Sequence, residues 1–596
     1  MNNLHSFHIP VMGLAFTIDT PIKVAHLGIS SVISLGDDFL IEKALMFYSN
    51  KYSIPIGKID RKEKETRTNI ITYYLDLIDE IVDINWNLHI NNLIEDDNYR
   101  NEFFDLLPDD TFWKNKWKNS IMNLPKKQKV EFCKINFTKG GIDVNIMTKV
   151  DKKNYLNGEE LPIQFNDAHA AICGFVNSKL KSSVVLSAGM SPALFNFMQK
   201  FDEFLPNCDG KLLKKITVKV SDYRSALIQG KMLAKKGLWV SEIRIESGLN
   251  CGGHAFPTNG NLLGPILEEF KQRRNEIYEE LYSIYNSTLK ASGKFVNNFF
   301  PRMKISAQGG VGTNQEHNFL LKNYALDSVG WGSPFLLVPE AVSIDNITLQ
   351  MLSCAREDDI YLSDASPLGI PFNNLKNSTR QQHQNQKVLA NKAGSPCTKK
   401  FLKMNTEFGD EGLCTASREY IKNAIDLLEK SKLSATVQEK EKQKLYEKEC
   451  LCCGLSMPFM VEHNLSHRME GHGVSVCPGP NLAYFEGIFS LKDMIKHIYG
   501  RKNLISRTDR PNVFIKEIQL YMDYLAKQLL KYNELREIKM KNNLSQFIEN
   551  MQSSIKYYKE QFLEESDFTK NIELFQVQLN EFYSKLSTNK FELLNS

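Results

Sequence analysis

The stretch Ile305-Ser-Ala-Gln-Gly-Gly-Val-Gly-Thr313, followed by Ala325-Leu-Asp-Ser-Val-Gly-Trp-Gly-Ser-Pro-Phe335, decides the fold class of this chain. Each half is typical of a short strand that ends in glycines, and a helix-length segment separates the two. Glycine loops at helix N-termini offer backbone N–H groups to an anion. In (β/α)8 barrels the usual phosphate site is built from the loops after strands 7 and 8. We therefore expect Gly309, Gly310, Gly332 and Ser333 to hold a phosphate; ordinary turn glycines are the plainer alternative.

Strand-like segments also precede this pair and alternate with helical patterns. Six of them bring the total to eight, at residues 8–16, 29–35, 142–148, 183–189, 215–220 and 241–248. Eight alternating βα units favour a closed barrel over an open doubly wound sheet. The sequence thus predicts an α/β fold, a (β/α)8 TIM barrel with a helical insertion and a C-terminal cysteine-rich, mainly helical region.

Composition shifts along the chain suggest three parts. Residues 1–375 are expected to form the barrel, with a helical insertion at about 38–130 and a helical extension at 262–300, both too long for ordinary βα connections. Residues 376–490 form a cysteine-rich part, which begins with a polar stretch at 376–396 that is typical of a connector. Residues 491–596 show helical periodicity.

The overall composition is that of a globular protein. The 596 residues are 42% hydrophobic and 24% charged, with a net charge of +4. A nearly neutral balance gives no indication of a nucleic-acid partner, and no apolar run is long enough to span a membrane. No signal peptide is recognisable, so the expected location is cytoplasmic.

A third glycine-rich loop follows the strand at 241–246 and reads Glu246-Ser-Gly-Leu-Asn-Cys-Gly-Gly-His-Ala255. Catalytic residues of barrels lie in such loops at the carboxyl ends of strands. His254 is the group in this loop that works near neutral pH, and it is the candidate catalytic base. A hydrogen-bonded loop histidine without a catalytic role is the alternative.

The order of these motifs resembles the nitronate monooxygenase (2-nitropropane dioxygenase) family, which are FMN-dependent (β/α)8 barrels. The family's opening motif is similar to Ile9-Pro-Val-Met-Gly13, and its Gly-Gly-His motif is similar to Gly252-Gly253-His254. Its two phosphate loops are similar to Ala307-Gln-Gly-Gly-Val311 and Gly332-Ser-Pro-Phe335. The match covers residues 8–40 and 140–372. Pro334 and Ser247 stand where the family has arginine and glutamine.

The resemblance implies a set of FMN contacts. Asn145 would contact the flavin ring, and Ser247 and Gly252 would line it. Lys219, near the end of its strand, is a candidate for a positive charge near the flavin, and a solvated loop lysine is the alternative. Gly309, Gly310, Gly332 and Ser333 would hold the phosphate, and His254 would take a proton from the substrate carbon. The full set of implied cofactor residues is Met12, Gly13, Asn145, Lys219, Ser247, Gly252, Gly253, Gly309, Gly310, Gly332 and Ser333.

The cysteine-rich part predicts a metal centre. Its cysteines stand beside turn-forming residues, and thiolates on turns suit an Fe–S cluster or a structural zinc. The candidate ligands are Cys397, Cys414, Cys452, Cys453 and Cys477. The Cys477-Pro pair favours a [4Fe-4S] cluster, whereas the intervening His463, His467 and His472 keep zinc open. Buried cysteines without a metal are a further alternative.

Together these features predict an FMN-dependent oxidoreductase that acts on a small-molecule substrate. A C-terminal cluster would connect FMN with ferredoxin or another electron carrier. Two alternatives stay open, namely an NAD(P)H-dependent enoyl reductase of the same flavin-barrel group and a non-catalytic flavin- or metal-binding scaffold subunit. A homo-oligomer is also left open.

Overall fold

Eight parallel strands close into a barrel, in the order β1-β10-β9-β8-β7-β6-β3-β2. The computed structural model describes residues 4–187, 189–207, 210–294, 300–465, 471–566, 568–569 and 571–595. All eight predicted strands are present and confirm the predicted fold class. Their bounds are β1 Phe7–Ile9, β2 Ser30–Ser34, β3 Ile142–Met147, β6 Ser183–Ser187, β7 Lys215–Val220, β8 Val240–Glu246, β9 Lys304–Gln308 and β10 Ser328–Gly330.

Helices cover the outside of the barrel, and their starts follow from local sequence. Asp222 caps the helix that follows β7, and Thr313 and Glu316 form a capping box at the helix that follows β9. The helices between β1 and β10 that belong to this coat are α1 Thr20–Val24, α2 Asp38–Tyr52, α3 Thr66–Glu95, α7 Asp167–Asn177, α8 Pro192–Met198, α9 Tyr223–Ala234, α10 Leu263–Gln272, α11 Arg274–Ala291 and α12 Asn314–Asn323.

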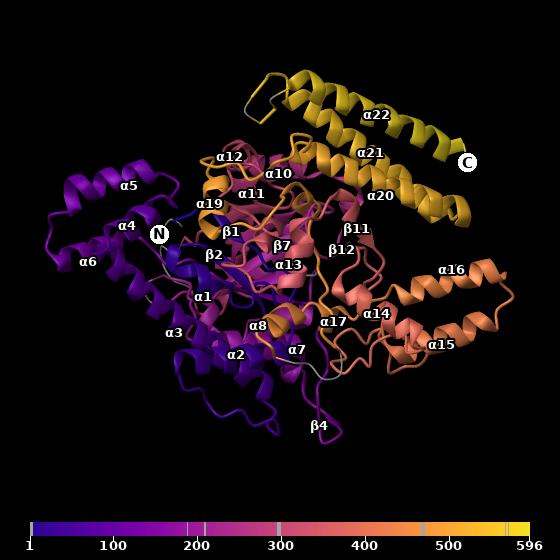
Figure 1. The fold of residues 1–596 in the computed structure, drawn as a ribbon, viewed down its shortest axis with the longest axis horizontal. Helices are drawn as coiled ribbons and strands as arrows, with labels where there is room; N and C mark the ends of the chain where they lie inside the picture. The colour runs from indigo at the N-terminus through magenta and orange to yellow at the C-terminus, as the bar shows by residue number, and fades with distance from the viewer. Residues whose placement is uncertain are drawn as a thin grey trace.

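The predicted insertion at about 38–130 is helical, but it has two parts. Helices α2 and α3 pack against each other, and α3 also packs against α7, so they belong to the barrel coat. Helices α4 Asp97–Phe104, α5 Asp110–Lys116 and α6 Lys126–Asn136 lie beyond them and project from the barrel (Figure 1). A second small core, which includes Phe104, Trp117 and Phe137, holds this projection together.

The chain after β10 begins with α13 Asn346–Ser353 and a two-stranded sheet of β11 Ile360–Ser363 and β12 Phe372–Leu375. The predicted connector at 376–396 is wrong in part, because α14 Thr379–Leu389 is a helix. Ser378 caps it and Arg380 is buried in it. The prediction relied on polar composition alone, whereas a capped helix can also be polar on most of its surface.

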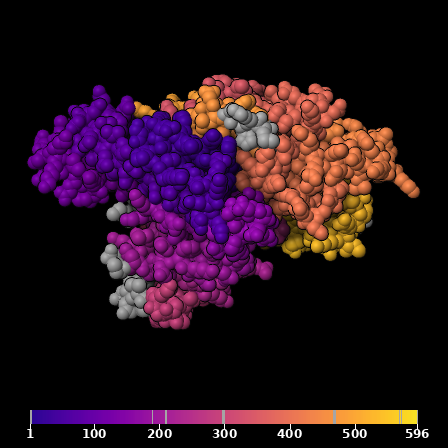
Figure 2. Space-filling view, turned by 90° about the horizontal axis from the view of Figure 1, so that it is seen from below, coloured from indigo at the N-terminus to yellow at the C-terminus, as the bar shows by residue number. Residues whose placement is uncertain are grey.

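The cysteine-rich part and the tail are mainly helical, as predicted. The helices are α15 Arg418–Glu429, α16 Ala435–Tyr446, α17 Leu451–Gly454, α18 Met457–Glu462, α19 Leu491–Ile498, α20 Val513–Leu535, α21 Ile538–Gln561 and α22 Ile572–Asn595. The last three form a layer beside the barrel (Figure 1), and their apolar faces join the barrel's own hydrophobic core. In the space-filling view the cysteine-rich residues lie against the N-terminal residues (Figure 2). Among the described helices, none has the length and apolar character needed to cross a membrane.

Charged side chains fill part of the barrel interior. Arg244 on β8 donates to Glu242 at 2.9 Å and lies 3.4 Å from Asp143 on β3, a strand that does not neighbour β8. Burial opposes ionisation of Glu242, yet the charge of Arg244 lowers its pKa to about 2. Ser306 on β9 donates a further hydrogen bond of 2.6 Å to Glu242. This ion network therefore links strands across the barrel.

We predict that Arg244→Leu lowers the free energy of unfolding by about 3–5 kcal/mol, because it leaves two buried carboxylates without their cation. Urea denaturation of the purified variant measures the change. Lys126→Ala is the control, since Lys126 pairs with Glu95 on the surface and such pairs contribute about 1 kcal/mol or less. Equal stability of the two variants would contradict a supporting role for the interior network.

Candidate functional site

The predicted flavin residues gather at the carboxyl ends of the barrel strands. Asn145 lies on β3, Lys219 on β7, Ser247 just after β8, Gly309 just after β9 and Gly332 just after β10. This is the face on which barrel enzymes place their active sites. The structure thus brings together residues that are up to 187 positions apart in the sequence.

The two glycine loops after β9 and β10 present backbone donors that no protein group uses. No hydrogen bond found within the described ranges involves the N–H groups of Gly309, Gly310, Gly332 or Ser333. Gly309 and Gly310 have φ values of 123° and 79°, which favour glycine. All four residues are partly exposed. Donors of this kind suit a phosphate group.

A carboxylate of the chain takes the neighbouring donors of the same loop. Glu316 accepts hydrogen bonds from the N–H groups of Gly312 at 2.9 Å and Thr313 at 3.3 Å. Arg510 holds this carboxylate with bonds of 2.8 and 2.9 Å, and it donates a further bond of 3.0 Å to the carbonyl of Gly310. Only the first half of the β9 loop is therefore left for an external anion.

The segment from Cys477 to Asn481 forms the outer wall of this site. The Gly479 N–H donates to Ser333 Oγ at 2.7 Å, and Asn481 Nδ2 donates to the carbonyl of Val311 at 2.9 Å. A Cβ on Gly252 would come within 2.4 Å of the Cys477 carbonyl oxygen. Glycine at position 252 thus allows two backbone segments to lie in contact.

The residues predicted to contact the flavin ring differ in whether their polar atoms have partners in the protein. Asn145 Oδ1 is buried and accepts no hydrogen bond from any described residue. Lys219 forms an ion pair of 3.0 Å with Glu246, whose other oxygen accepts from Gln308 at 2.6 Å. A buried acceptor without a partner and unused loop donors fit a polar ligand such as FMN. The residues present are therefore compatible with the predicted group.

Met12 and Gly13, the other two predicted contacts, lie in the loop after β1. Met12 is buried and its N–H donates to Thr17 Oγ1 at 3.3 Å. Gly13 has a φ of 53°, and an added Cβ would lie 3.0 Å from the ring of Phe16. Their contact with a flavin stays a prediction, since both also have clear structural roles.

Ser247 contacts a carboxylate that was not predicted from the sequence to lie here. Its hydroxyl donates to Glu517 Oε1 of α20 at 2.6 Å, and Glu517 Oε2 accepts from the N–H of Leu263 at 2.9 Å. Burial raises the pKa of Glu517 to about 7. The tail helix α20 thereby fixes the β8 loop that carries Gly252, Gly253 and His254.

His254 lies beside a small apolar hollow. Its Nε2 is 2.7 Å from Ser366 Oγ, and its ring packs edge-on against Phe372 at 5.1 Å between centroids. Burial, with a smaller contribution from the charge of Lys219, lowers the pKa of His254 to about 4. The imidazole is therefore neutral at pH 7.

The hollow has a volume of about 90 Å³. Sites for drug-sized ligands are usually about 300 Å³ or larger, so this space suits a few-atom substrate and not a flavin ring. Apolar side chains dominate its wall, among them Leu14, Leu35, Met147, Leu368, Leu402 and Leu455.

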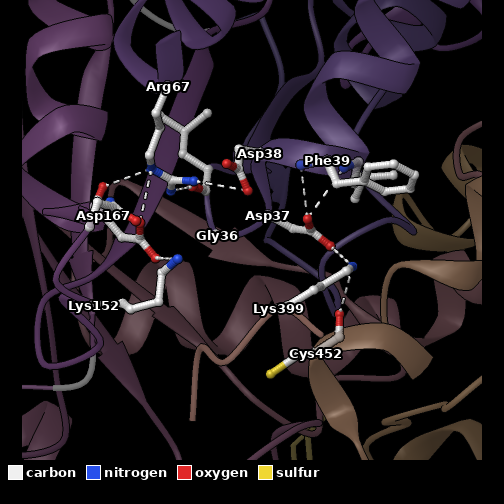
Figure 3. Close-up of polar contacts among 12 residues, drawn as sticks. Gly36, Asp37, Asp38, Phe39, Arg67, Lys152, Asp167, Lys399 and Cys452 are labelled. Carbon is white, nitrogen blue, oxygen red and sulfur yellow. Dashed lines mark hydrogen bonds and ion pairs between the residues drawn. The ribbon is translucent and has the colours of Figure 1, made fainter. Parts of the chain in front are cut away.

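Arg67 and Asp167 line the hollow and form an ion pair, and Lys399 forms an ion pair with Asp37 nearby (Figure 3). Arg67 donates to the carbonyl of Leu35 at 2.9 Å and lies between Asp38 and Asp167. Lys399 pairs with Asp37 and donates to the carbonyl of Cys452 at 3.3 Å. Asp37 also caps α2, so Lys399 connects the cysteine-rich part with the loop after β2.

The predicted metal ligands do not converge as one set. Cys397, Cys414 and Cys452 share a small apolar cluster with Phe401 and Leu402. Cys477 lies in a different cluster with Phe372 and Leu451, and Cys453 is buried in α17. His463 stacks on Phe47 at 4.2 Å, and His467 lies outside the described residues. Over the part of the chain that the structure describes, no three His, Cys, Asp or Glu side chains are arranged to hold a metal ion.

A larger cleft of about 940 Å³ lies between the start of α12, the loop at 500–512 and α22. It is rich in charge, but its cations are paired. Arg507 contacts Asp509 and Glu357, and Arg510 contacts Glu316. Such pairing gives no net attraction for an anion, so His254 and the glycine loops remain the better candidate site.

The fold and the site define a closed parallel barrel with a candidate active site at its carboxyl face. No protein-family model matches the chain, and no curated protein matches it. Among solved structures, the enoyl reductase domain of MlnA from the macrolactin biosynthesis cluster from Bacillus amyloliquefaciens is similar over 69% of this chain and 89% of that domain. The sequence identity is 16% and the TM-score is 0.32. A likeness of this strength carries no argument about function.

We predict that the His254 imidazole titrates near pH 4. The unfolded chain, with an ordinary histidine pKa near 6.5, takes up this proton first as the pH falls. His254 thus lowers stability progressively between about pH 6.5 and 4, and its effect is absent above that range. Histidine-selective NMR measures the titration, with His254→Gln assigning the signal. A midpoint near 6.5 would show that the imidazole is not buried as described.

Proposed function

We propose that this chain is an FMN-dependent oxidoreductase whose substrate space is the apolar hollow beside His254. One observation carries the proposal: two consecutive βα loops at the carboxyl face of the barrel present four unused N–H donors, at Gly309, Gly310, Gly332 and Ser333. The resemblance to nitronate monooxygenases independently points to a phosphate-bearing flavin at these residues.

Different residues of the site would bind different parts of FMN. The four loop N–H groups would hold the phosphate, and Asn145 would offer its unpartnered oxygen to a donor of the ring. When bound, FMN supplies the two-electron chemistry that no side chain can perform. The protein supplies position and a proton acceptor.

His254 would act as that acceptor. If Ser366 accepts the hydrogen bond from Nε2–H, the lone pair lies on Nδ1, which has no hydrogen-bond partner among the described residues. A neutral imidazole at pH 7 can take a proton from a carbon beside an activating group. The apolar wall excludes water from the hollow and favours a small, mostly apolar substrate.

We predict that Gly332→Asp weakens FMN binding by about tenfold or more, which corresponds to about 1.4 kcal/mol. Gly332 has a φ of −100°, and an added Cβ would lie 3.3 Å from Pro10 Cγ, so either side chain requires the same small shift of that ring. Fluorescence titration with FMN measures the change. Gly332→Asn is the matched control, since it has the same shape without the repelling charge. Equal affinities of the two variants, or no FMN binding by the native chain, would refute the proposal.

We predict that His254→Gln keeps FMN affinity but slows anaerobic reduction of the bound flavin by about a hundredfold or more, as expected for loss of a general base. A panel of small nitro and carbonyl compounds serves as substrates, and the oxidised-flavin absorbance band reports the rate. Flavin content measured on the same sample separates lost chemistry from lost cofactor. An unchanged reduction rate with an active substrate would exclude His254 as the base.

A further inference from the structure

A parallel β-bridge between Ser395 and Ser417 lies close to two cysteines of the C-terminal part. The Ser395 N–H donates to the Ala416 carbonyl at 2.9 Å, and the Arg418 N–H donates to the Ser395 carbonyl at 2.8 Å. Cys397 comes two residues after Ser395, and Cys414 comes two residues before Ala416. These bonds tie the two ends of the loop that joins the cysteines.

A second pair of bonds fixes the loop nearer to Cys414. Asn405 and Leu413 exchange hydrogen bonds of 3.0 and 2.6 Å, and the Cys414 carbonyl accepts from the Ser417 N–H at 2.8 Å. Cys397 has a φ of 54°, a left-handed conformation that costs free energy for a side chain other than glycine. Surrounding contacts thus hold the backbone of Cys397 in this conformation.

The two side chains meet inside an apolar cluster. Cys414 and Cys397 are hydrogen-bonded to each other, so their sulfur atoms are in contact. Cys397 is half-buried, whereas Cys414 is 4% exposed. The Cys397 thiol is therefore partly accessible to solvent, and the Cys414 thiol is buried next to it.

The loop between the cysteines also forms part of the hollow beside His254. Phe401 and Leu402 belong to this loop and line the hollow, and both pack in the same cluster as the two cysteines. Cys452 contacts this cluster and lines the hollow as well. A covalent link between the ends of the loop would thus fix one wall of the candidate substrate space.

We propose that Cys397 and Cys414 are a redox-active dithiol that closes to a disulfide and braces the wall of the His254 hollow. In the step, a low-molecular-weight disulfide is reduced to two thiols while Cys397 and Cys414 are oxidised. Cys397 Sγ attacks one sulfur of the small disulfide and releases the first thiol. Cys414 Sγ then attacks the mixed disulfide at Cys397 and releases the second, and the two protein thiol protons end on the two departing thiolates.

The test uses the full-length protein in buffers with different ratios of reduced to oxidised dithiothreitol. After acid quenching and alkylation, peptide mass mapping should find one reversible disulfide between the peptides of Cys397 and Cys414, with a loss of two hydrogen atoms per chain. The native chain alone can refute the proposal: if both thiols remain alkylatable under fully oxidising conditions, or if they pair with other cysteines, it is wrong.

Variants and metal analysis complete the test. Cys397→Ser and Cys414→Ser should each abolish the link, whereas Cys354→Ser, which removes an exposed cysteine away from the loop, should keep it. Oxidation should raise the Tm of the native chain and of Cys354→Ser but not of Cys397→Ser. Iron or zinc bound to the purified chain and lost in both loop variants would instead identify the cysteines as metal ligands and overturn the proposal.

Discussion

The contact between Arg510 and Glu316 holds the carboxyl face of the barrel together. Glu316 lies in the first turn of α12, and its carboxylate accepts hydrogen bonds from the β9 loop and from the N–H of Val513 at the start of α20. Arg510 adds bonds to the Gly310 carbonyl and to Asn481 Oδ1. Three segments that are far apart in sequence thus share one buried ion pair. Other polar contacts, such as Ser247 with Glu517 and Ser333 with Gly479, fix the C-terminal part to the same face.

This ion pair also sets what the glycine loops can bind. A helix N-terminus attracts any carboxylate or phosphate, and an internal glutamate has the advantage of a high effective concentration. Glu316 takes Gly312 and Thr313, which are nearest to the helix start. The remaining donors face the β10 loop, where Gly332 and Ser333 add two more. The candidate phosphate position is thus displaced from the end of α12 towards the space between the two strands.

The sequence predicts the barrel well because each strand and each turn can be recognised from a few neighbouring residues. Each strand carries its own apolar run, and glycines after β8, β9 and β10 mark the loops that must bend tightly or let another backbone approach. Gly309, with its φ of 123°, is such a case. The capping box of Thr313 and Glu316 is visible in the same way. The predicted connector at 376–396 was wrong in part, because a polar helix such as α14 and a polar connector have the same composition.

Much of the site could not be predicted, because its members meet only through the fold. Glu517 reaches Ser247 across 270 positions, and Arg510 reaches Glu316 across 194. Neither residue stands in a motif, and a single Glu or Arg on a helix surface usually faces solvent. The grouping of Cys397 and Cys414 is similar: the sequence shows a cysteine-rich part, but only the fold brings these two side chains into hydrogen-bond contact.

The flavin site and the dithiol are physically separable, although they meet at one hollow. The phosphate donors belong to the β9 and β10 loops and depend on Glu316 and Arg510 for their shape. The dithiol belongs to the loop at 397–414 and depends on its own backbone bonds. Cys397 and Cys414 make no contact with the glycine loops in the hydrogen bonds and apolar clusters of the described residues. Loss of flavin binding at Gly332 would therefore leave the disulfide intact, and loss of the disulfide would leave the loop donors in place. What the two share is the wall formed by Phe401 and Leu402 beside His254, so the oxidation state of the dithiol affects the chemistry of the barrel only through the shape of that hollow.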